Sequence, residues 1–190
     1  RGLDGRVNDH VLPLVSDDFY APLIREPRPT NGAELTAGVY YLDLGSLQAA
    51  AWAKLLPVVE HARAIILDFR GYVNATTVEV VAHLAKQELR SPIWQMPVIP
   101  NVGSHKYSVG YWDIRPQVPR LHAKIVALTD ARAISSVETI LQIFRENSLG
   151  VLVGETTGGT NGNIVIAEMP GGFSIRFTAV RASSVDGSTV

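Results

Sequence analysis

A pair of serines, Ser135 and Ser136, lies between a short apolar run at residues 124–128 and an amphipathic pattern at residues 137–144. The apolar positions of that pattern recur on one face of a helix, at Val137, Ile140, Leu141 and Phe144. A hydroxyl at such a strand-to-helix junction projects from a rigid frame. It also lies beside the first N–H groups of the helix, which have no intrahelical acceptor and favour an anion. Acyl-transfer enzymes build a nucleophile and an oxyanion hole from these parts.

The same residues also fit a purely structural interpretation. Ser135 is followed three residues later by Glu138, which is the spacing of a capping box at a helix start. Such caps are common, so the local sequence alone favours the cap over the nucleophile.

The glycine-rich segment at residues 154–163 is the second candidate functional feature. It has no Gly-Lys-Ser/Thr ending and leads into a strand, whereas phosphate-binding loops lead into a helix. We therefore expect no nucleotide site. Since loops at the carboxyl ends of parallel strands often bind ligands, we expect this one to pack beside the start of the Ser135 helix and to shape a substrate cleft.

Titratable residues give weaker signals. Asp43 and Asp68 each follow an apolar strand, and we expect Asp68 to form an ion pair or a turn hydrogen bond. His61 and His83 fall in predicted helices, where we expect them to be solvated or partly buried and not catalytic. The five histidines are His10, His61, His83, His105 and His122. No pair has a metal-ligand spacing near a carboxylate, so we predict no metal and no cofactor.

Composition limits the class of protein. The chain has 190 residues, 46% of them apolar and 18% charged, which suits one globular domain. A net charge of −1 gives no indication of nucleic acid as a partner, and no apolar run is long enough to span a membrane. The absence of cysteine excludes disulfides and thiolate chemistry.

Predicted strands and helices alternate after a proline-rich start. We expect residues 1–34 to be an arm or a linker from a preceding domain, and residues 35–190 to be a core domain truncated at both ends. Predicted strands cover residues 38–44, 64–69, 124–128 and 150–155, the second and fourth as buried runs. Predicted helices cover residues 46–62, capped by Ser46 and kinked or ended early by Pro57, then residues 76–89, and the segment after Ser135.

Two further segments depart from this alternation. Residues 91–120 are rich in proline, glycine and aromatic residues, and we expect an ordered excursion that forms a lid or a binding wall. Residues 164–170 and 171–182 are typical of antiparallel strands joined at Pro170-Gly171-Gly172. The whole pattern predicts an α/β fold with a layered, largely parallel sheet, crossover helices and antiparallel strands near the carboxyl terminus.

Four segments in this order resemble the carboxyl-terminal processing peptidases, a family of serine peptidases that includes the tricorn core protease. The segments are AIILDFRGYVNAT at residues 64–76, KIVALTDARAISSVETILQIF at 124–144, GVLVGETTGGTNGN at 150–163, and VDGST at 185–189. The resemblance runs from about Gly38 to Gly187. It implies a ClpP/crotonase-like spiral core, with Ser135 as the nucleophile.

The resemblance also implies roles for backbone groups. The oxyanion hole would use the N–H groups of Ser136 and Asn74. Substrate-binding positions would be Gly71, Tyr72, Gly158, Gly159 and Thr160.

The chain departs from the family at the general base. The processing peptidases place a lysine twenty-five residues after the nucleophile, where this chain has Thr160, and no lysine follows Lys124. A threonine hydroxyl cannot act as a base near neutral pH, so a Ser-Lys pair is excluded. The tricorn-like branch uses a histidine and a glutamate instead, and His10 is a weak candidate for that histidine.

Our leading hypothesis is the core catalytic domain of a tricorn-like serine endopeptidase, acting on peptides or proteins through Ser135 and a backbone oxyanion hole. The isolated chain could be inactive, since neither base nor acid is identified in it. One alternative is a non-catalytic module that binds small apolar ligands or peptides, for which Trp94 and Trp112 are suited. A hydratase-like thioester enzyme is a third alternative without a supporting motif. The resemblance alone favours an extracytoplasmic location and leaves a homo-oligomer open.

Overall fold

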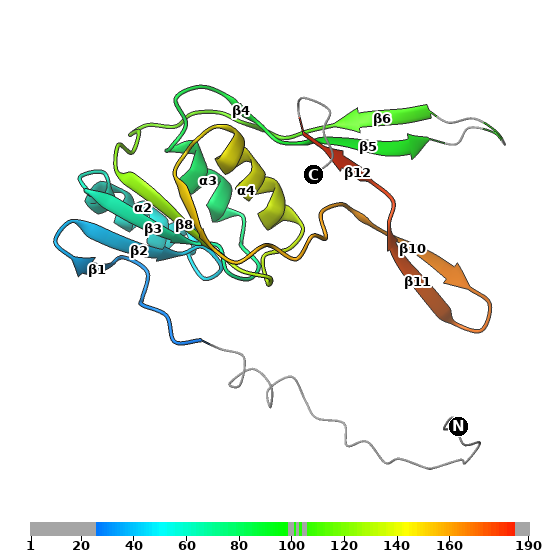
Figure 1. Cartoon of the computed structure of the whole chain (residues 1–190), viewed down its shortest axis with the longest axis horizontal. Helices are drawn as coiled ribbons and strands as arrows, with labels where there is room; N and C mark the ends of the chain where they lie inside the picture. The colour runs from blue at the N-terminus through cyan, green and yellow to red at the C-terminus, as the bar shows by residue number, and fades with distance from the viewer. Residues whose placement is uncertain (1–25, 99–100, 102, 104–105, 185–190) are drawn as a thin grey trace, which may run out of the picture.

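A five-stranded sheet forms the centre of the molecule, in the computed structural model that describes residues 26–98, 101, 103 and 106–184 (Figure 1). Its strand order is β1-β2-β3-β8-β9. The first pair is antiparallel, and the other three pairs are parallel. The strands are β1 (Ala33–Thr36), β2 (Val39–Asp43), β3 (Ala64–Asp68), β8 (Lys124–Thr129) and β9 (Val151–Gly154). The predicted α/β class with a largely parallel sheet is confirmed.

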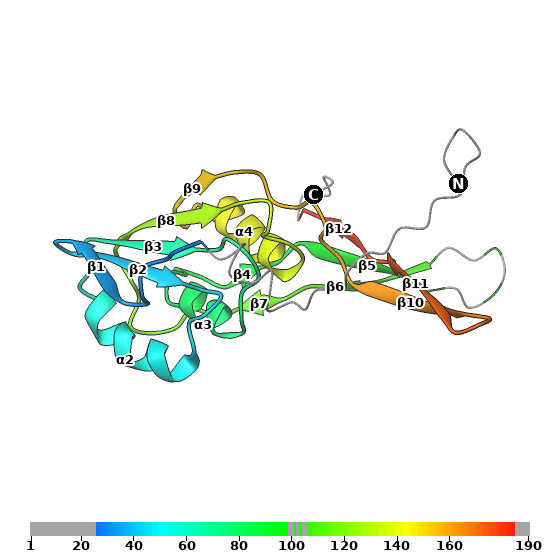
Figure 2. The same cartoon turned by 90° about the horizontal axis from the view of Figure 1, so that it is seen from below.

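The helices cover one face of this sheet. Each parallel strand is added on the same side of the previous one, so right-handed crossovers place α2 (Ala49–Val59), α3 (Thr76–Ala82) and α4 (Ser136–Glu146) on a common face. Figure 2 shows α2 and α3 beneath the strands. The burial of the β3 side chains is consistent with one covered face, because Ile65 and Leu67 are fully buried, whereas Ile66 between them is half-buried. The prediction that this strand is buried on both faces was therefore wrong.

Helix boundaries differ from the predicted ones. Helix α2 begins after Gln48 and not at Ser46, whose hydroxyl instead accepts a hydrogen bond from Asn31. Pro57 lies inside α2, which continues only to Val59, so the early end was predicted correctly. Helix α3 ends at Ala82, well before residue 89, although the following residues through Ala85 stay buried. None of the helices in the described ranges is long and apolar enough to cross a membrane.

Within the predicted excursion at residues 91–120, the described residues include antiparallel strands, a pairing that the sequence did not predict. Strands β5 (Ile93–Val98) and β6 (Lys106–Gly110) form a hairpin, and β12 (Arg181–Ser183) pairs with β5. Two short strands, β4 (Leu89–Arg90) and β7 (Asp113–Ile114), pair at its base. The hairpin projects away from the main sheet (Figures 1 and 2).

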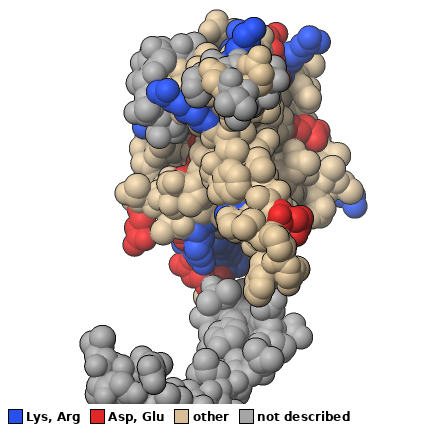
Figure 3. Space-filling view, turned by 90° about the vertical axis from the view of Figure 1, so that its right-hand side faces the viewer, with Lys and Arg blue, Asp and Glu red and all other residues tan. Residues whose placement is uncertain are grey.

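The second projecting hairpin pairs β10 (Ile164–Met169) with β11 (Phe173–Thr178), which confirms the predicted antiparallel strands and their turn. One face of it consists only of apolar residues: Val165, Ala167, Met169, Phe173, Ile175 and Phe177. Most of these side chains are exposed, Phe173 by 72%. Seen from the end to which both hairpins point, most of the described surface has no Lys, Arg, Asp or Glu (Figure 3).

Strand β9 differs from its prediction as a buried run. It is the last strand of the main sheet, and Val151 and Val153 are 62% and 48% exposed. An apolar run therefore does not distinguish a central strand from an edge strand.

Residues 26–34, which the sequence assigned to an arm, contact the main sheet. Arg28 donates to the Asp43 carboxylate at 3.1 Å and to the Arg70 carbonyl at 2.8 Å, and its Nε lies 3.7 Å from Asp68. Strand β1 begins within this segment. The preceding residues, 1–25, lie outside the described part of the chain.

A buried carboxylate organises the carboxyl ends of these strands. Asp68 is fully buried and accepts hydrogen bonds from the Arg70 guanidinium, at 2.7 Å from Nη2, and from the Tyr41 hydroxyl. The predicted ion pair at Asp68 is thus present. Burial opposes ionisation, but the Arg70 and Tyr41 hydrogen bonds outweigh it and hold the pKa of Asp68 below its usual value. Burial and the neighbouring Asp68 raise the pKa of Tyr41.

Replacing this carboxylate should destabilise the protein. We expect Asp68→Asn to lower the free energy of unfolding at pH 7 by about 3 kcal/mol, because it removes one partner of a buried ion pair. The folded-state pKa lies below the unfolded value of about 4, so this stabilisation is complete above that value and is lost as the pH falls through the folded-state pKa. Urea unfolding at a series of pH values should therefore show a shallower acid loss in the variant than in the wild type.

Asp113→Asn is the matched control, since it breaks an exposed pair with Arg90. It should change stability little. An equal loss of unfolding free energy in the two variants would contradict the stabilising role of Asp68.

Candidate active site

Ser135 has a backbone conformation that is unusual for its residue type. It lies between β8 and α4 with φ 57° and ψ −120°, and only one other non-glycine residue of the described chain, Ser148, has a positive φ. A side chain in this region costs on the order of 1 to 3 kcal/mol, and such residues cluster at functional sites. The sharp strand-to-helix turn lifts the residue out of the regular backbone path, as in the elbow that presents a nucleophile.

The Ser135 hydroxyl occupies the capping position of α4 without a regular cap hydrogen bond. It faces the backbone N–H of Glu138 in the arrangement of a capping box, yet it makes no hydrogen bond of ordinary geometry with the helix end. The residue is half-buried and lines a small groove of about 40 Å³. The other residues of this Ser135 groove are Trp94, Trp112, Ser136, Thr139, Asn161, Gly162 and Asn163.

Glu138 joins the two segments singled out in the sequence. Its carboxylate accepts the N–H of Ser135 at 2.9 Å, of Gly159 at 2.7 Å and of Thr160 at 3.0 Å. Glu138 is 7% exposed, so these hydrogen bonds replace the solvation of a buried charge. The carboxylate thereby fixes the glycine-rich loop, residues 154–163, against the turn that contains Ser135.

A glycine completes this attachment. The N–H of Gly158 donates to the Ala133 carbonyl at 3.0 Å. A Cβ at Gly158 would lie 2.6 Å from the Ile134 side chain and 3.1 Å from the Ala131 carbonyl oxygen, so a larger residue would require the loop or Ile134 to shift. The predicted packing of the loop beside the helix start is confirmed.

The two backbone groups predicted for the oxyanion hole have different surroundings. Ser136 is the first residue of α4, and no described acceptor takes its N–H. The N–H of Asn74 donates to the Leu44 carbonyl at 3.4 Å, and the Asn74 side-chain amide donates to the Leu47 carbonyl at 2.6 Å. Asn74 is absent from the residues that line the Ser135 groove.

The remaining predicted positions lie on two separate turns. Gly71 and Tyr72 follow β3, and Tyr72 is 61% exposed. Their turn is linked to the Ser135 segment through Glu26, which accepts from Arg70 at 2.9 Å and from Arg132 at 3.3 Å. Neither Gly71 nor Tyr72 is among the described residues of the groove, whereas Gly159 and Thr160 are held beside it by Glu138.

No titratable side chain is among the described residues that line the groove. His83 is fully buried, with Nδ1 2.7 Å from the Pro119 carbonyl, whereas His61 and His122 are exposed. His10 and His105 lie outside the described residues. Within the described ranges, no cluster of three or more potential ligand side chains could hold a metal ion.

Asn161 is a site residue that the sequence did not single out. Its side-chain oxygen accepts from the Thr139 hydroxyl at 3.2 Å, which ties the far end of the glycine-rich loop to α4. Trp94 and Trp112, with ring centroids 4.7 Å apart, form the aromatic side of the groove. The aromatic content of residues 91–120 was the signal for this wall, but nothing in the sequence distinguishes Asn161 from its polar neighbours.

Solved structures of peptidases share this fold. A candidate peptidase from Parabacteroides merdae superposes with a TM-score of 0.70 at 16% identity, covering 90% of this chain and 58% of that one. Mature CPAF complexed with lactacystin superposes with a TM-score of 0.65 at 14% identity, covering 90% of this chain and 55% of that one. The photosystem II D1 C-terminal processing protease superposes with a TM-score of 0.56 at 14% identity. This match covers 80% of this chain and 39% of that one. This chain therefore spans between 39% and 58% of the length of these proteins.

Sequence comparison identifies the family. No curated protein sequence matches the chain. The sequence model of peptidase family S41 matches residues 39–190, which is most of the chain. Together with the shared fold, this match confirms the predicted resemblance to the carboxyl-terminal processing peptidases. The chain belongs to peptidase family S41.

Proposed function

We propose that this chain is the catalytic core of a serine endopeptidase in which the Ser135 hydroxyl attacks the peptide carbonyl. The observation that supports this most directly is the strained backbone of Ser135 at the strand-to-helix turn, together with its position in a groove. A serine that only capped α4 would need neither the positive φ nor a position in a groove. Membership of family S41 and the peptidase neighbours favour this function over the non-catalytic carrier.

The oxyanion that forms during attack would be stabilised at the start of α4. The Ser136 N–H has no described acceptor, and the positive end of the helix dipole lies there. In this proposal Asn74 supplies the second N–H. That role requires the Asn74 N–H to exchange its long 3.4 Å hydrogen bond with Leu44 for the substrate oxyanion.

Glu138 acts as a positioning residue in this mechanism. Its carboxylate fixes the Ser135 N–H and two N–H groups of the loop, and all of its described contacts are to the backbone. It therefore holds the nucleophile turn in place.

The proton of Ser135 must pass to a base outside the described lining of the groove. Position 160 is a threonine, and we propose a tricorn-like arrangement in which a histidine takes this role. His10 remains a weak candidate. A peptide or protein substrate would lie along the groove, with Trp94 and Trp112 on one side.

A fluorophosphonate probe tests the nucleophile in the full-length protein. We expect covalent labelling of the wild type and none of Ser135→Ala, since the probe bonds to an activated serine oxygen. Labelling is read by intact mass. Ser148→Ala is the matched control, because Ser148 also has a positive φ and lies at the other end of α4; it should label normally. Undiminished labelling of Ser135→Ala would overturn the assignment.

Relief of backbone strain gives an independent test. Ser135→Gly should abolish labelling and yet raise the free energy of unfolding by about 1 kcal/mol, since glycine adopts a positive φ without penalty. Thermal or urea unfolding measures the gain. Ser148→Gly should stabilise similarly and retain labelling. A loss of stability in Ser135→Gly would show that the conformation of Ser135 is not strained.

Removing the charge of Glu138 should loosen the nucleophile turn. In Glu138→Gln an amide donor faces backbone N–H groups that need an acceptor, and we expect a loss of about 2 to 3 kcal/mol of stability. Hydrogen exchange at the amides of Gly159 and Thr160 should accelerate more than exchange elsewhere in the chain. Glu155→Gln, at an exposed position of the same loop, is the control, and equal exchange in the two variants would contradict this role.

A further inference from the structure

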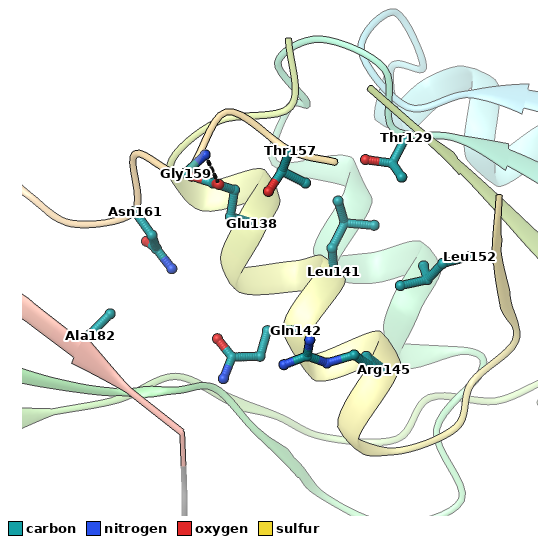
Figure 4. A pocket seen from close by; sticks show the side chains of 10 residues that line it. All are labelled: Thr129, Glu138, Leu141, Gln142, Arg145, Leu152, Thr157, Gly159, Asn161 and Ala182. Carbon is teal, nitrogen blue, oxygen red and sulfur yellow. Dashed lines mark hydrogen bonds between the residues drawn. The ribbon is translucent and has the colours of Figure 1, made fainter. Parts of the chain in front are cut away.

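A second, larger cavity lies beside the Ser135 groove. This Gln142 pocket has a volume of about 410 Å³, which is within the range of small-molecule sites (Figure 4). It lies between α4, the ends of β8 and β9, the glycine-rich loop and β12. Its lining residues are Thr129, Glu138, Leu141, Gln142, Arg145, Leu152, Thr157, Gly159, Asn161 and Ala182.

Three polar atoms of this lining have no hydrogen-bond partner among the described residues. They are Thr129 Oγ1, Gln142 Oε1 and Asn161 Nδ2, and all three are buried. Gln142 is only 5% exposed. Its orientation is fixed, because Nε2 donates to Glu146 at 2.8 Å and to Ser184 at 2.7 Å, which leaves Oε1 free. Buried polar atoms are normally paired, so these three need a water molecule or a ligand in the pocket as their partner.

The free atoms of Gln142 and Asn161 form a complementary pair. Figure 4 shows the Asn161 amide nitrogen and the Gln142 amide oxygen directed into the pocket from the loop and from α4. One is a donor and the other an acceptor. An amide group of a ligand offers the matching acceptor and donor on two atoms of one rigid unit, whereas a hydroxyl offers both on a single atom and a simple ion offers only one of them.

The exposed Arg145 is the cationic group of the pocket that is available to a ligand. Glu138 and Arg145 are its only charged lining residues among those described. The Glu138 carboxylate is already bound by three backbone N–H groups, whereas Arg145 forms no ion pair with a described acidic residue. The Arg145 guanidinium reaches back along the helix toward Gln142 (Figure 4). Leu141 and Leu152 supply an apolar wall.

We infer that the Gln142 pocket binds a small carboxylate that also contains an amide, namely an N-acyl amino acid or the carboxyl end of a short peptide. The carboxylate pairs with Arg145, and the amide bridges Asn161 and Gln142. A modest apolar side chain contacts Leu141 and Leu152. This site is separate from the Ser135 groove and shares with it only Asn161, so the inference does not depend on the proposed nucleophile.

N-acetyl-L-leucine is the direct probe. Titrated into the full-length protein, it should give saturable changes in the side-chain amide resonances of Asn161 and Gln142 and in the backbone amide of Gly159, observed by ¹⁵N-resolved NMR. A ligand of this size should bind with a Kd on the order of a millimolar. N-acetyl-L-leucinamide, which lacks the carboxylate, should bind at least fivefold more weakly.

Two variants separate the parts of the site. Arg145→Gln should abolish the preference for the carboxylate, whereas Arg115→Gln, which removes a charge from a highly exposed arginine, should leave it intact. Gln142→Met keeps the volume but removes the acceptor, and it should weaken both ligands. Absence of saturable changes at Asn161 and Gln142 would show that water alone satisfies these atoms, and would overturn the inference. Equal affinity of the two ligands for the wild type would do so as well.

Discussion

The carboxylate of Glu138 is the point on which the geometry of this region depends. It is buried, and its two oxygens together accept three backbone N–H groups, one from the turn before α4 and two from the glycine-rich loop. Because an unpaired buried charge is costly, loop and turn can separate only at a large energetic penalty. The strained conformation of Ser135 persists because these surroundings hold it in place. One acidic side chain thus fixes the turn that contains Ser135 and the glycine-rich loop, which also forms part of the Gln142 pocket.

A second group of charged residues stabilises the carboxyl ends of β2 and β3. The parallel register places Asp43 and Asp68 side by side, and Asp68 opposite Leu128 of β8. Like charges so close would repel one another, and Arg28 and Arg70 provide the compensating positive charge. Since Arg28 comes from outside the α/β core pattern, the segment before β1 contributes to the stability of the sheet edge at which the loops after β2 and β3 begin.

Much of this architecture could be predicted from the sequence, because short apolar runs and helical periodicity directly reflect burial. The turn at Ser135 was also recognisable, since a strand, a polar junction and an amphipathic helix follow one another. The exposure of β9 could not be predicted, because an edge strand and a central strand share the same composition. The pairing of Asn161 with Thr139, and the free oxygen of Gln142, depend on contacts between distant segments. Sequence periodicity contains no information about such polar contacts, so the sequence indicated the turn at Ser135 and the aromatic wall but not the polar residues between them.

The exposed edge of the main sheet has a practical consequence for work with this chain. Strand β9 is a run of Val-Leu-Val with solvent-exposed side chains, and no described strand pairs with its outer side. Unpaired strand edges of this composition recruit other strands and promote fibrillar or amorphous aggregation. Solubility during expression should therefore respond strongly to a single lysine placed at Val151, whereas equivalent changes on the covered face of β8 would disrupt folding.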